Sequence, residues 1–153
     1  AADKGADRAY LALGKLYTSE KKTEDAKAAF QKYMEKHPKD ADALEQLASI
    51  AADAGDYADA ATYYKDAMEA ASGDQVKELQ KALVAVYEKN GDFASALEEA
   101  KDYVADYPED ETMQKEYEFL QTRVLTGLEN TGTDNTQQAD DTAADTTTEG
   151  NGQ

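Results

Sequence analysis

Apolar side chains recur along residues 6–127 at spacings of three and four, which is the pattern of one face of a helix. Alanine, leucine, glutamate, lysine and glutamine dominate this region, and all of them favour helices. The residues that break helices are few and fall between the periodic runs, at Pro38, Gly55, Gly73, Gly91 and Pro108. The pattern predicts an all-α chain of short helices joined by tight turns.

One part of this pattern occurs three times. The stretch GDYADAATYY at 55–64 returns 36 residues later as GDFASALEEA at 91–100, and TEDAKAAFQKY at 23–33 is an earlier copy. Aligning the copies gives a column of alanines, a second column four residues later and a third column after three more. These columns are Ala26, Ala60 and Ala96; Phe30, Tyr64 and Ala100; and Tyr33, Ala67 and Tyr103. A spacing of four and then three predicts that each copy is a helix with one buried face.

A second apolar stripe precedes each copy and predicts another helix. The three stripes are Tyr10, Leu13, Gly14 and Tyr17; Leu44, Leu47, Ala48 and Ala51; and Gln80, Leu83, Val84 and Tyr87. The chain is therefore predicted to contain two-helix units at residues 7–40, 41–74 and 77–110. Gln75 and Val76 are inserted before the third unit and should lengthen the helix that follows them.

Turns are predicted within the units at residues 19–22, 53–56 and 89–92. Gly14 and Ala48 are small, so they should let the two helices of a unit approach closely. Asp56 and Asp92 are predicted to cap the second helices of their units by accepting free backbone N–H groups. Thr23 is predicted to cap the second helix of the first unit.

The stripes and columns together resemble the tetratricopeptide repeat, whose signature is an aromatic residue followed by Leu-Gly, Tyr, Ala, Phe and Pro at these spacings. The first unit carries almost the whole signature: Tyr10, Leu13, Gly14, Tyr17, Ala26, Phe30 and Pro38. The second unit departs from it at Ala51 and Ser72, and the third departs at Gln80 and Ala100. The resemblance covers residues 7–110 and implies a right-handed α–α superhelix, a solenoid of about seven antiparallel helices.

The two ends of the predicted solenoid differ. Residues 111–127 are predicted to form a capping helix with an apolar inward stripe and a polar outward stripe, as a terminal helix of an array requires. The inward residues are Met113, Tyr117, Leu120 and Val124, and the outward residues are Gln114, Glu118 and Gln121. Residues 1–6 are interpreted as a lead-in. No equivalent cap precedes Asp7, which favours further chain upstream of it.

Residues 128–153 differ from the rest of the chain in composition. From residue 129 they include no Leu, Ile, Val, Phe, Tyr, Met, Lys or Arg, and six are acidic. Such a segment has no apolar surface to offset its ordering entropy, so it is predicted to be a disordered, solvating tail rich in Thr and Asp. A fold-back inhibitor or a calcium-attracting tail is the alternative interpretation.

The resemblance also implies a binding site, because the first helices of such repeats line a concave groove that takes peptides or protein segments. The groove positions carried over to this chain are Arg8, Leu11, Ala12, Lys15 and Thr18; Asp42, Glu45, Gln46, Ser49 and Asp53; Glu78, Lys81, Ala82, Ala85, Glu88 and Lys89; and Lys115, Glu116, Phe119 and Arg123. This set holds six cations and six anions. The groove is therefore predicted to be nearly neutral, on a protein that is strongly acidic elsewhere.

One subclass of the family binds the C-terminal carboxylate of chaperones through Lys and Asn side chains from three successive repeats. The corresponding positions here are Leu11, Lys15, Gln46, Glu78 and Ala82. Gln46 alone is chemically similar to the clamp, and Glu78 would repel a carboxylate. The sequence therefore predicts no binding of a chaperone tail.

Composition narrows the function further. The chain has 33 acidic and 16 basic residues and a net charge of −17, which disfavours nucleic acid and anionic membrane surfaces as partners. It has no cysteine, no apolar run long enough to span a bilayer, no phosphate-binding loop and no metal or nucleophile motif. Its one histidine, His37, is interpreted as part of a helix terminus. The sequence thus predicts no enzyme, no cofactor and no metal site.

These observations favour a non-catalytic scaffold that binds a protein or peptide segment in its concave groove. The alternative is structural: an end-piece of a longer repeat array, or a self-association module without a separate ligand. The acidic tail, the absence of cysteine and a start without methionine fit a mature bacterial extracytoplasmic protein. They fit an excised cytoplasmic domain nearly as well, so the sequence leaves localisation open.

Overall fold

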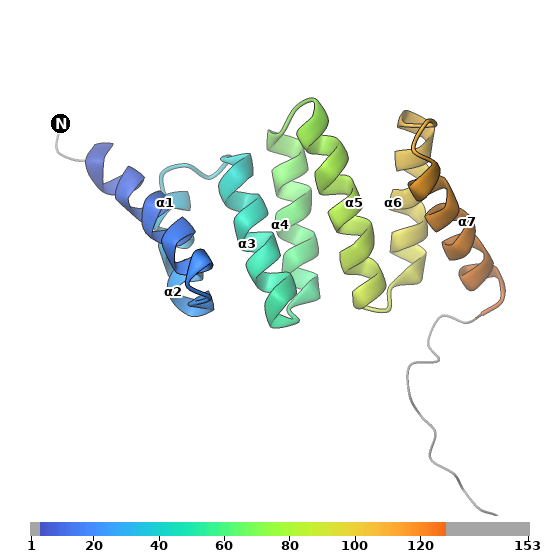
Figure 1. Cartoon of the computed structure of the whole chain (residues 1–153), viewed down its shortest axis with the longest axis horizontal. Coiled ribbons are helices and arrows are strands. Elements are labelled where there is room, and N and C mark those ends of the chain that lie inside the picture. The colour runs from blue at the N-terminus through green and yellow to red at the C-terminus, as the bar shows by residue number, and fades with distance from the viewer. Residues whose placement is uncertain (1–3, 128–153) are drawn as a thin grey trace, which may run out of the picture.

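The computed structural model describes residues 4–127, and these residues form seven helices and no strand (Figure 1). The helices are α1 (Lys4–Ser19), α2 (Thr23–Met34), α3 (Ala41–Ala54), α4 (Tyr57–Ala70), α5 (Asp74–Lys89), α6 (Phe93–Asp106) and α7 (Glu111–Leu125). The prediction of an all-α chain of about seven helices is confirmed. Helix α1 already begins at Lys4, inside the stretch interpreted as a lead-in.

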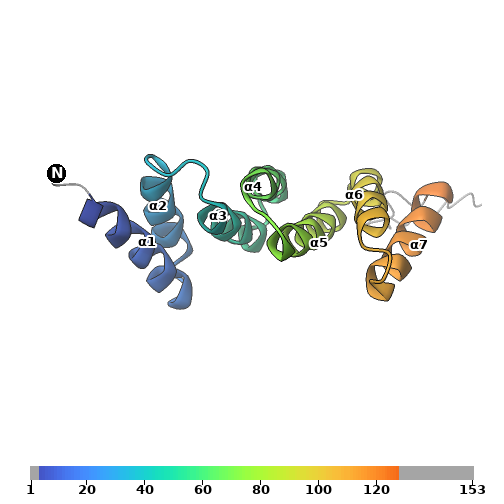
Figure 2. The ribbon, with the colours of Figure 1, turned by 90° about the horizontal axis from the view of Figure 1, so that it is seen from above.

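The helices form one row in which each packs against its neighbours along the chain. Seen from above, α1, α3, α5 and α7 lie along one side of the row, and α2, α4 and α6 lie along the other (Figure 2). Helices α1 and α7, at the two ends, project farthest toward the side of α3 and α5. This side of the row is therefore concave.

The predicted repeat columns form the core. Ala26, Ala60 and Ala96 are all fully buried, in equivalent places on α2, α4 and α6. Leu47 of α3 clusters with residues of α2, and Leu83 of α5 clusters with residues of α4. Each of these first helices is thus covered by the second helix of the unit before it, and burial of this apolar surface joins the units.

Gly14 permits a close approach within the first unit, as predicted. A Cβ atom at this position would lie 2.8 Å from a ring carbon of Phe30, closer than real side chains pack. Phe30 itself is fully buried. The absence of a side chain at Gly14 therefore lets α1 lie directly on the Phe30 ring of α2.

The predicted inward stripe of α1 is partly wrong. Tyr10 and Leu13 were assigned to the core, yet each is 38% exposed. Within residues 4–127 no helix precedes α1, so nothing covers the face that carries them. The side of α1 that meets the core instead presents Leu11, Gly14 and Tyr17.

The first and last junctions between units share a hydrogen-bonded device that the sequence analysis missed. Tyr33 donates its hydroxyl to Asp40 at 2.6 Å, and Asp40 accepts from the backbone N–H of Ala43 at 3.0 Å. Tyr103 donates to Asp110 at 2.8 Å, and Asp110 likewise accepts backbone N–H groups in the first turn of α7. At the middle junction the column residue is alanine, and α5 begins without a side-chain cap. A Tyr–Asp pair therefore fixes two of the three junctions.

Of the three predicted helix caps, only one makes the expected capping hydrogen bond. Asp92 accepts the backbone N–H of Ser95 at 3.1 Å and caps α6 as expected. Asp56 occupies the cap position of α4, but its side chain makes no capping hydrogen bond. Thr23 is the first residue of α2, one position beyond the cap, so its assignment was wrong.

The C-terminal end follows the predicted pattern. Met113 and Leu120 of α7 are buried, whereas its outward residues Gln114, Glu118 and Gln121 are exposed. The insertion lengthens the following helix as expected, because α5 has 16 residues and α3 has 14. The predicted disordered tail, residues 128–153, lies outside the described residues.

Candidate peptide-binding groove

The predicted groove residues all lie on α1, α3, α5 and α7, the helices of the concave side (Figure 2). The fold thus brings four separate stretches of the chain onto one side. Some of their side chains already form hydrogen bonds or ion pairs with other residues of the protein, and others do not. That difference decides which of them can contact a partner.

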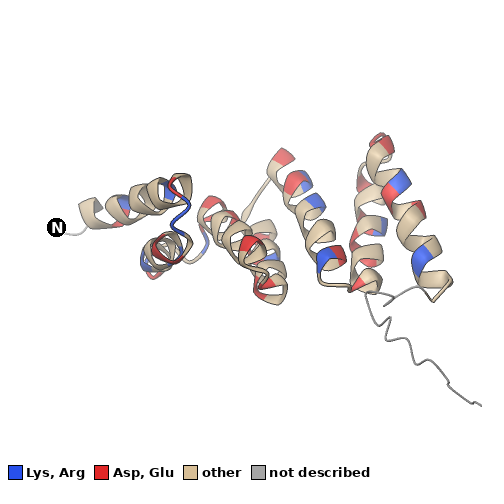
Figure 3. Ribbon diagram, turned by 60° about the horizontal axis from the view of Figure 1, so that its bottom comes forward, with Lys and Arg blue, Asp and Glu red and all other residues tan. Residues whose placement is uncertain are grey.

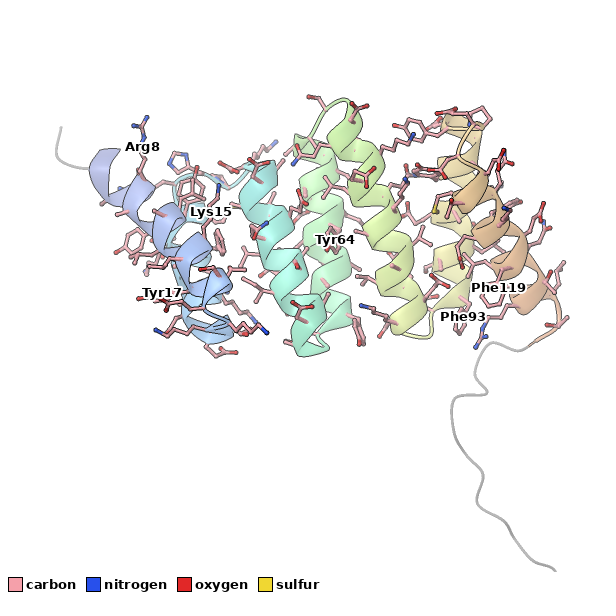
Figure 4. All side chains as sticks on the ribbon, in the orientation of Figure 1. Arg8, Lys15, Tyr17, Tyr64, Phe93 and Phe119 are labelled. Carbon is pink, nitrogen blue, oxygen red and sulfur yellow. The ribbon has the colours of Figure 1, made fainter. Side chains whose placement is uncertain are left out.

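The part on α1 is cationic and open. Arg8 and Lys15 are exposed, and neither forms an ion pair within residues 4–127 (Figure 4). Ala12 and Thr18 are also exposed. Leu11 is half-buried and packs on the core cluster between α2 and α3, so less of its surface faces a partner than the sequence implied.

The acidic part on α3 is partly satisfied within the protein. Gln75 donates its side-chain amide to Asp42 at 2.9 Å and to Glu45 at 3.2 Å. Gln75 belongs to the two-residue insertion, which therefore links α5 to α3 across the concave side. Gln46 is half-buried and Ser49 is exposed, so these two polar side chains lie beside the engaged carboxylates.

Lys81 of α5 is engaged in the structure. Its Nζ lies 2.9 Å from a carboxylate oxygen of Asp110 and 5.5 Å from the ring centroid of Tyr103. The bond to Asp110 raises the pKa of Lys81, and the bonds from Lys81 and Tyr103 hold the pKa of Asp110 well below its usual range. Lys81 thus belongs to the device that fixes the start of α7, and a partner would have to compete with that device for its charge.

The part between α5 and α7 combines charge with aromatic surface. Glu88 of α5 and Glu116 of α7 are both half-buried. Burial raises the pKa of Glu88 to about 7, the hydrogen bond and charge of Glu116 act in the same direction, and Arg123 opposes them. The Arg123 guanidinium lies 3.8 Å from the ring centroid of Phe93 and 6.0 Å from that of Phe119. This end of the groove therefore holds a pair of carboxyl groups beside a cation stacked on aromatic rings.

Phe119 is the most exposed aromatic side chain of this end, with 51% of its surface open to solvent. Figure 4 shows Phe93 and Phe119 close to each other at the same end of α6 and α7. Lys89 and Lys115 are exposed and form no ion pair within the described part of the chain. Ala85 is exposed as well, so α5 and α7 offer an aromatic ring and two free cations.

The hollows of the surface are shallow and lie mainly at the junctions. One of about 240 Å³ lies between the α1–α2 turn and the C-terminal end of α3 and is lined by Thr18, Lys21, Thr23, Ala26, Ile50 and Asp53. Another of about 260 Å³ lies beside Pro38 and α4, away from the concave helices. Open hollows of this kind within residues 4–127 suit an extended segment better than a compact small molecule.

Residues 4–127 hold neither a metal-binding cluster nor a membrane-spanning helix. No three His, Cys, Asp or Glu side chains there are grouped so that they could hold a metal ion. No helix within that range is long and apolar enough to cross a bilayer.

The sequence analysis missed two residues that shape the site. Phe93 lies under the Arg123 guanidinium, and Gln75 holds the α3 carboxylates. Phe93 could have been noticed, because it is the aromatic residue of the repeated Gly-Asp-aromatic motif. Gln75 belongs to an insertion outside the repeat, so no sequence pattern indicated its role.

Comparison with known proteins agrees with this geometry. Residues 11–75 match the family model described as the tetratricopeptide repeat. A search of curated proteins found no match. Among solved structures, the N-terminal domain of stress-induced protein-1 (STI-1) from C. elegans is similar, with a TM-score of 0.70 and 17% identity over 79% of this chain and 98% of that one. The TPR2B domain of yeast Sti1, solved in a complex with pHsp70, is also similar. Its TM-score is 0.59 and its sequence identity 17%, over 79% of this chain and 97% of that one. The family match covers residues 11–75, less than half of the chain, and the solved structures share its helical repeat fold.

Proposed function

We propose that the concave side binds an extended segment of a partner protein, laid across α1, α3, α5 and α7. The observation that carries this proposal is a set of groups on that side that are available to a partner: four cations that form no ion pair within residues 4–127, and the exposed ring of Phe119. The cations are Arg8, Lys15, Lys89 and Lys115. On a chain with a net charge of −17, cations that avoid internal carboxylates on one side are available to a partner.

The chemistry of the groove suggests the chemistry of the segment. Carboxylates of the segment would meet the cations of α1 and, farther along, Lys89 and Lys115. An apolar residue would cover Phe119, whose exposed ring gains most from burial. The carboxylates of α3 between these cations favour a polar or basic residue there, although Gln75 already occupies part of their hydrogen-bonding capacity.

Two general points support a protein partner. Tetratricopeptide repeat domains are generally non-catalytic interaction modules, and we propose no reaction for this one. One structure of the same fold, yeast Sti1 TPR2B, is a complex with pHsp70. A chaperone C-terminal carboxylate remains an unfavourable ligand here, because Glu78 is exposed at a position where the clamp of that subclass needs a cation or an amide.

The experiment is a peptide array followed by calorimetry on the full chain. Segments that bind should lose at least about tenfold in affinity with Lys89→Glu combined with Lys115→Glu, because charge reversal replaces attraction with repulsion. The control matched in charge is Lys65→Glu combined with Lys101→Glu, since both lysines are exposed but lie on α4 and α6, on the opposite side. Phe119→Ala should weaken binding as well. Equal effects of the groove and control variants would overturn the proposal.

A further inference from the structure

One face of α1 presents apolar side chains that nothing within residues 4–127 covers. Its exposed members are Ala6, Ala9, Tyr10, Ala12, Leu13 and Leu16. Spacings of three and four place them on one side of the helix. An uncovered face of this width is uncommon on a surface helix, and such a face marks an interaction site.

The repeat shows what this face is shaped to receive. Leu13 corresponds to Leu47 and Leu83, which are 3% and 0% exposed, whereas Leu13 is 38% exposed. Leu16, 49% exposed, corresponds to two buried residues, Ile50 and Val86. In α3 and α5 these positions are covered by α2 and α4 respectively. The open face of α1 is therefore the surface on which a helix packs at two other places in the same molecule.

The covering helices share a stripe that defines the fitting partner. In α2 and α4 the stripe begins with an alanine, has an aromatic residue four positions later and an apolar residue three positions after that. The two stripes are Ala26, Phe30 and Tyr33; and Ala60, Tyr64 and Ala67. A helix with the same stripe can pack on α1 in the same way.

The charge of the first unit indicates which charged residues a partner helix should carry beside its apolar stripe. Residues 4–39 hold nine Lys and Arg against five Asp and Glu, whereas residues 40–127 hold seven against 21. Figure 3 shows the acidic residues spread over the units that follow α1 and α2. Arg8 and Lys15 lie along one edge of the open face. Lys32 of α2 lies near Tyr10 on the other edge, but it already pairs with Glu35 at 2.7 Å, so Arg8 and Lys15 supply most of the positive charge. A helix with acidic flanks therefore complements this basic unit.

We propose that the open face of α1 binds an amphipathic helix of another protein, which carries the small–aromatic–apolar stripe between Asp and Glu residues. A second copy of this chain fits less well. The stripes of α2 and α4 are already used inside the molecule, and pairing α1 with α1 would bring two basic units together. The site adjoins the concave groove and shares Arg8, Ala12 and Lys15 with it. Its test uses Leu13 and a defined peptide, whereas the groove is tested at Lys89 and Lys115, so the two proposals can fail separately.

The test uses the full chain and a defined probe, a peptide of residues 57–70. This peptide has the stripe of α4 and a net charge of −2 from Asp59, Asp66, Glu69 and Lys65. It is stapled on its polar face, because isolated helices of this length are marginal in water. Leu13→Glu in the protein should weaken binding at least about tenfold. Leu125→Glu should leave it unchanged, because Leu125 is a leucine with 79% exposure on the distant α7. A peptide with all three acidic residues changed to lysine should bind at least about tenfold more weakly.

Several results would overturn the inference. These are the absence of binding by the acidic peptide, equal binding by the lysine peptide, and binding that survives Leu13→Glu. A fourth result that would overturn it comes from sedimentation of the chain alone. Concentration-dependent dimers that Leu13→Glu abolishes would make a second copy the occupant. Because Leu13 is exposed, the variant should keep its helical circular dichroism, which excludes unfolding as the cause of lost binding.

Discussion

Helices α1 and α5 occupy the same position in their units, yet they meet different surroundings. Helix α5 lies between α4 and α6, and its stripe residues Leu83 and Val86 are buried. Helix α1 packs on α2 with one side only, and the equivalent residues Leu13 and Leu16 face solvent. The same local pattern therefore yields a core residue in one unit and an interaction surface in another.

The comparison shows which contacts of a repeat unit form within the unit and which require a neighbouring unit. Within a unit, contacts such as Gly14 on Phe30 require only the two helices of that unit. The outer stripe of a first helix requires a neighbour, because in a stacked array most of the core lies between units. Three experiments test this difference between α1 and the later first helices.

The largest effect is expected from truncating the column leucine in each unit. Leu83→Ala should lower the free energy of unfolding by about 2–5 kcal/mol, because it leaves a cavity at a fully buried site. Leu13→Ala should cost less than about 1 kcal/mol, since its side chain is already partly solvated. Urea denaturation of both variants measures the difference. Equal losses would show that the open face of α1 is covered in solution.

An intermediate effect is expected at the contact inside the first unit. Gly14→Ala should destabilise the fold by about 1–3 kcal/mol, because the new methyl group collides with the Phe30 ring. Gly5→Ala in the same helix is the matched control, since a Cβ there meets nothing within 4 Å. It should be neutral or stabilising by up to about 1 kcal/mol from helix propensity alone. Thermal melts that rank the two variants the other way would contradict the close packing of α1 on α2.

The smallest effect concerns the half-buried carboxyl groups of Glu88 and Glu116 between α5 and α7. The pKa of Glu88 is raised to about 7 from its ordinary value of 4.5, so the folded state binds more protons than the unfolded state between these two pH values. The stability should therefore fall as pH rises through this range. Glu88→Gln should remove the penalty and raise the Tm at pH 8 relative to wild type, with no such gain at pH 4. Because Glu88 is partly exposed, solvent screening limits the effect to roughly 1 kcal/mol, or about 3–5 °C.

The matched control for this pH effect is Glu118→Gln, at an exposed carboxylate of α7. It should give melts with the same pH dependence as wild type. A gain for Glu88→Gln that is equal at both pH values would show that the carboxyl group is not protonated in the folded state near neutral pH.

Much of the fold could be predicted from the sequence because the residues of the repeat columns are the ones that become buried between helices. Ala26, Ala60 and Ala96 can tolerate no larger side chain between packed helices, and this constraint is visible as a fixed spacing. The inward and outward stripes of α7 were readable for the same reason. Gly14 was informative since a glycine inside a helical pattern needs a packing reason.

Other features depend on contacts between residues far apart in the chain, and a local pattern cannot show them. Lys81 was assigned to the groove because its position fits, but Asp110 neutralises it from 29 positions away. The exposure of Leu13 depends on whether a neighbouring helix exists, and the stripe looks the same in either case. The hydrogen bonds from Gln75 arise from an insertion that repeats nowhere else.

The central claim is that a partner segment lies across the concave row of first helices. Amide chemical-shift mapping by NMR, with the tightest-binding peptide from the array, tests it most directly. A segment laid across that row should shift amides along α1, α3, α5 and α7, including those of Ser49, Ala85 and Phe119, and should leave the amides on the outer faces of α4 and α6 unchanged. Shifts confined to α4 and α6, with none at these three residues, would contradict it.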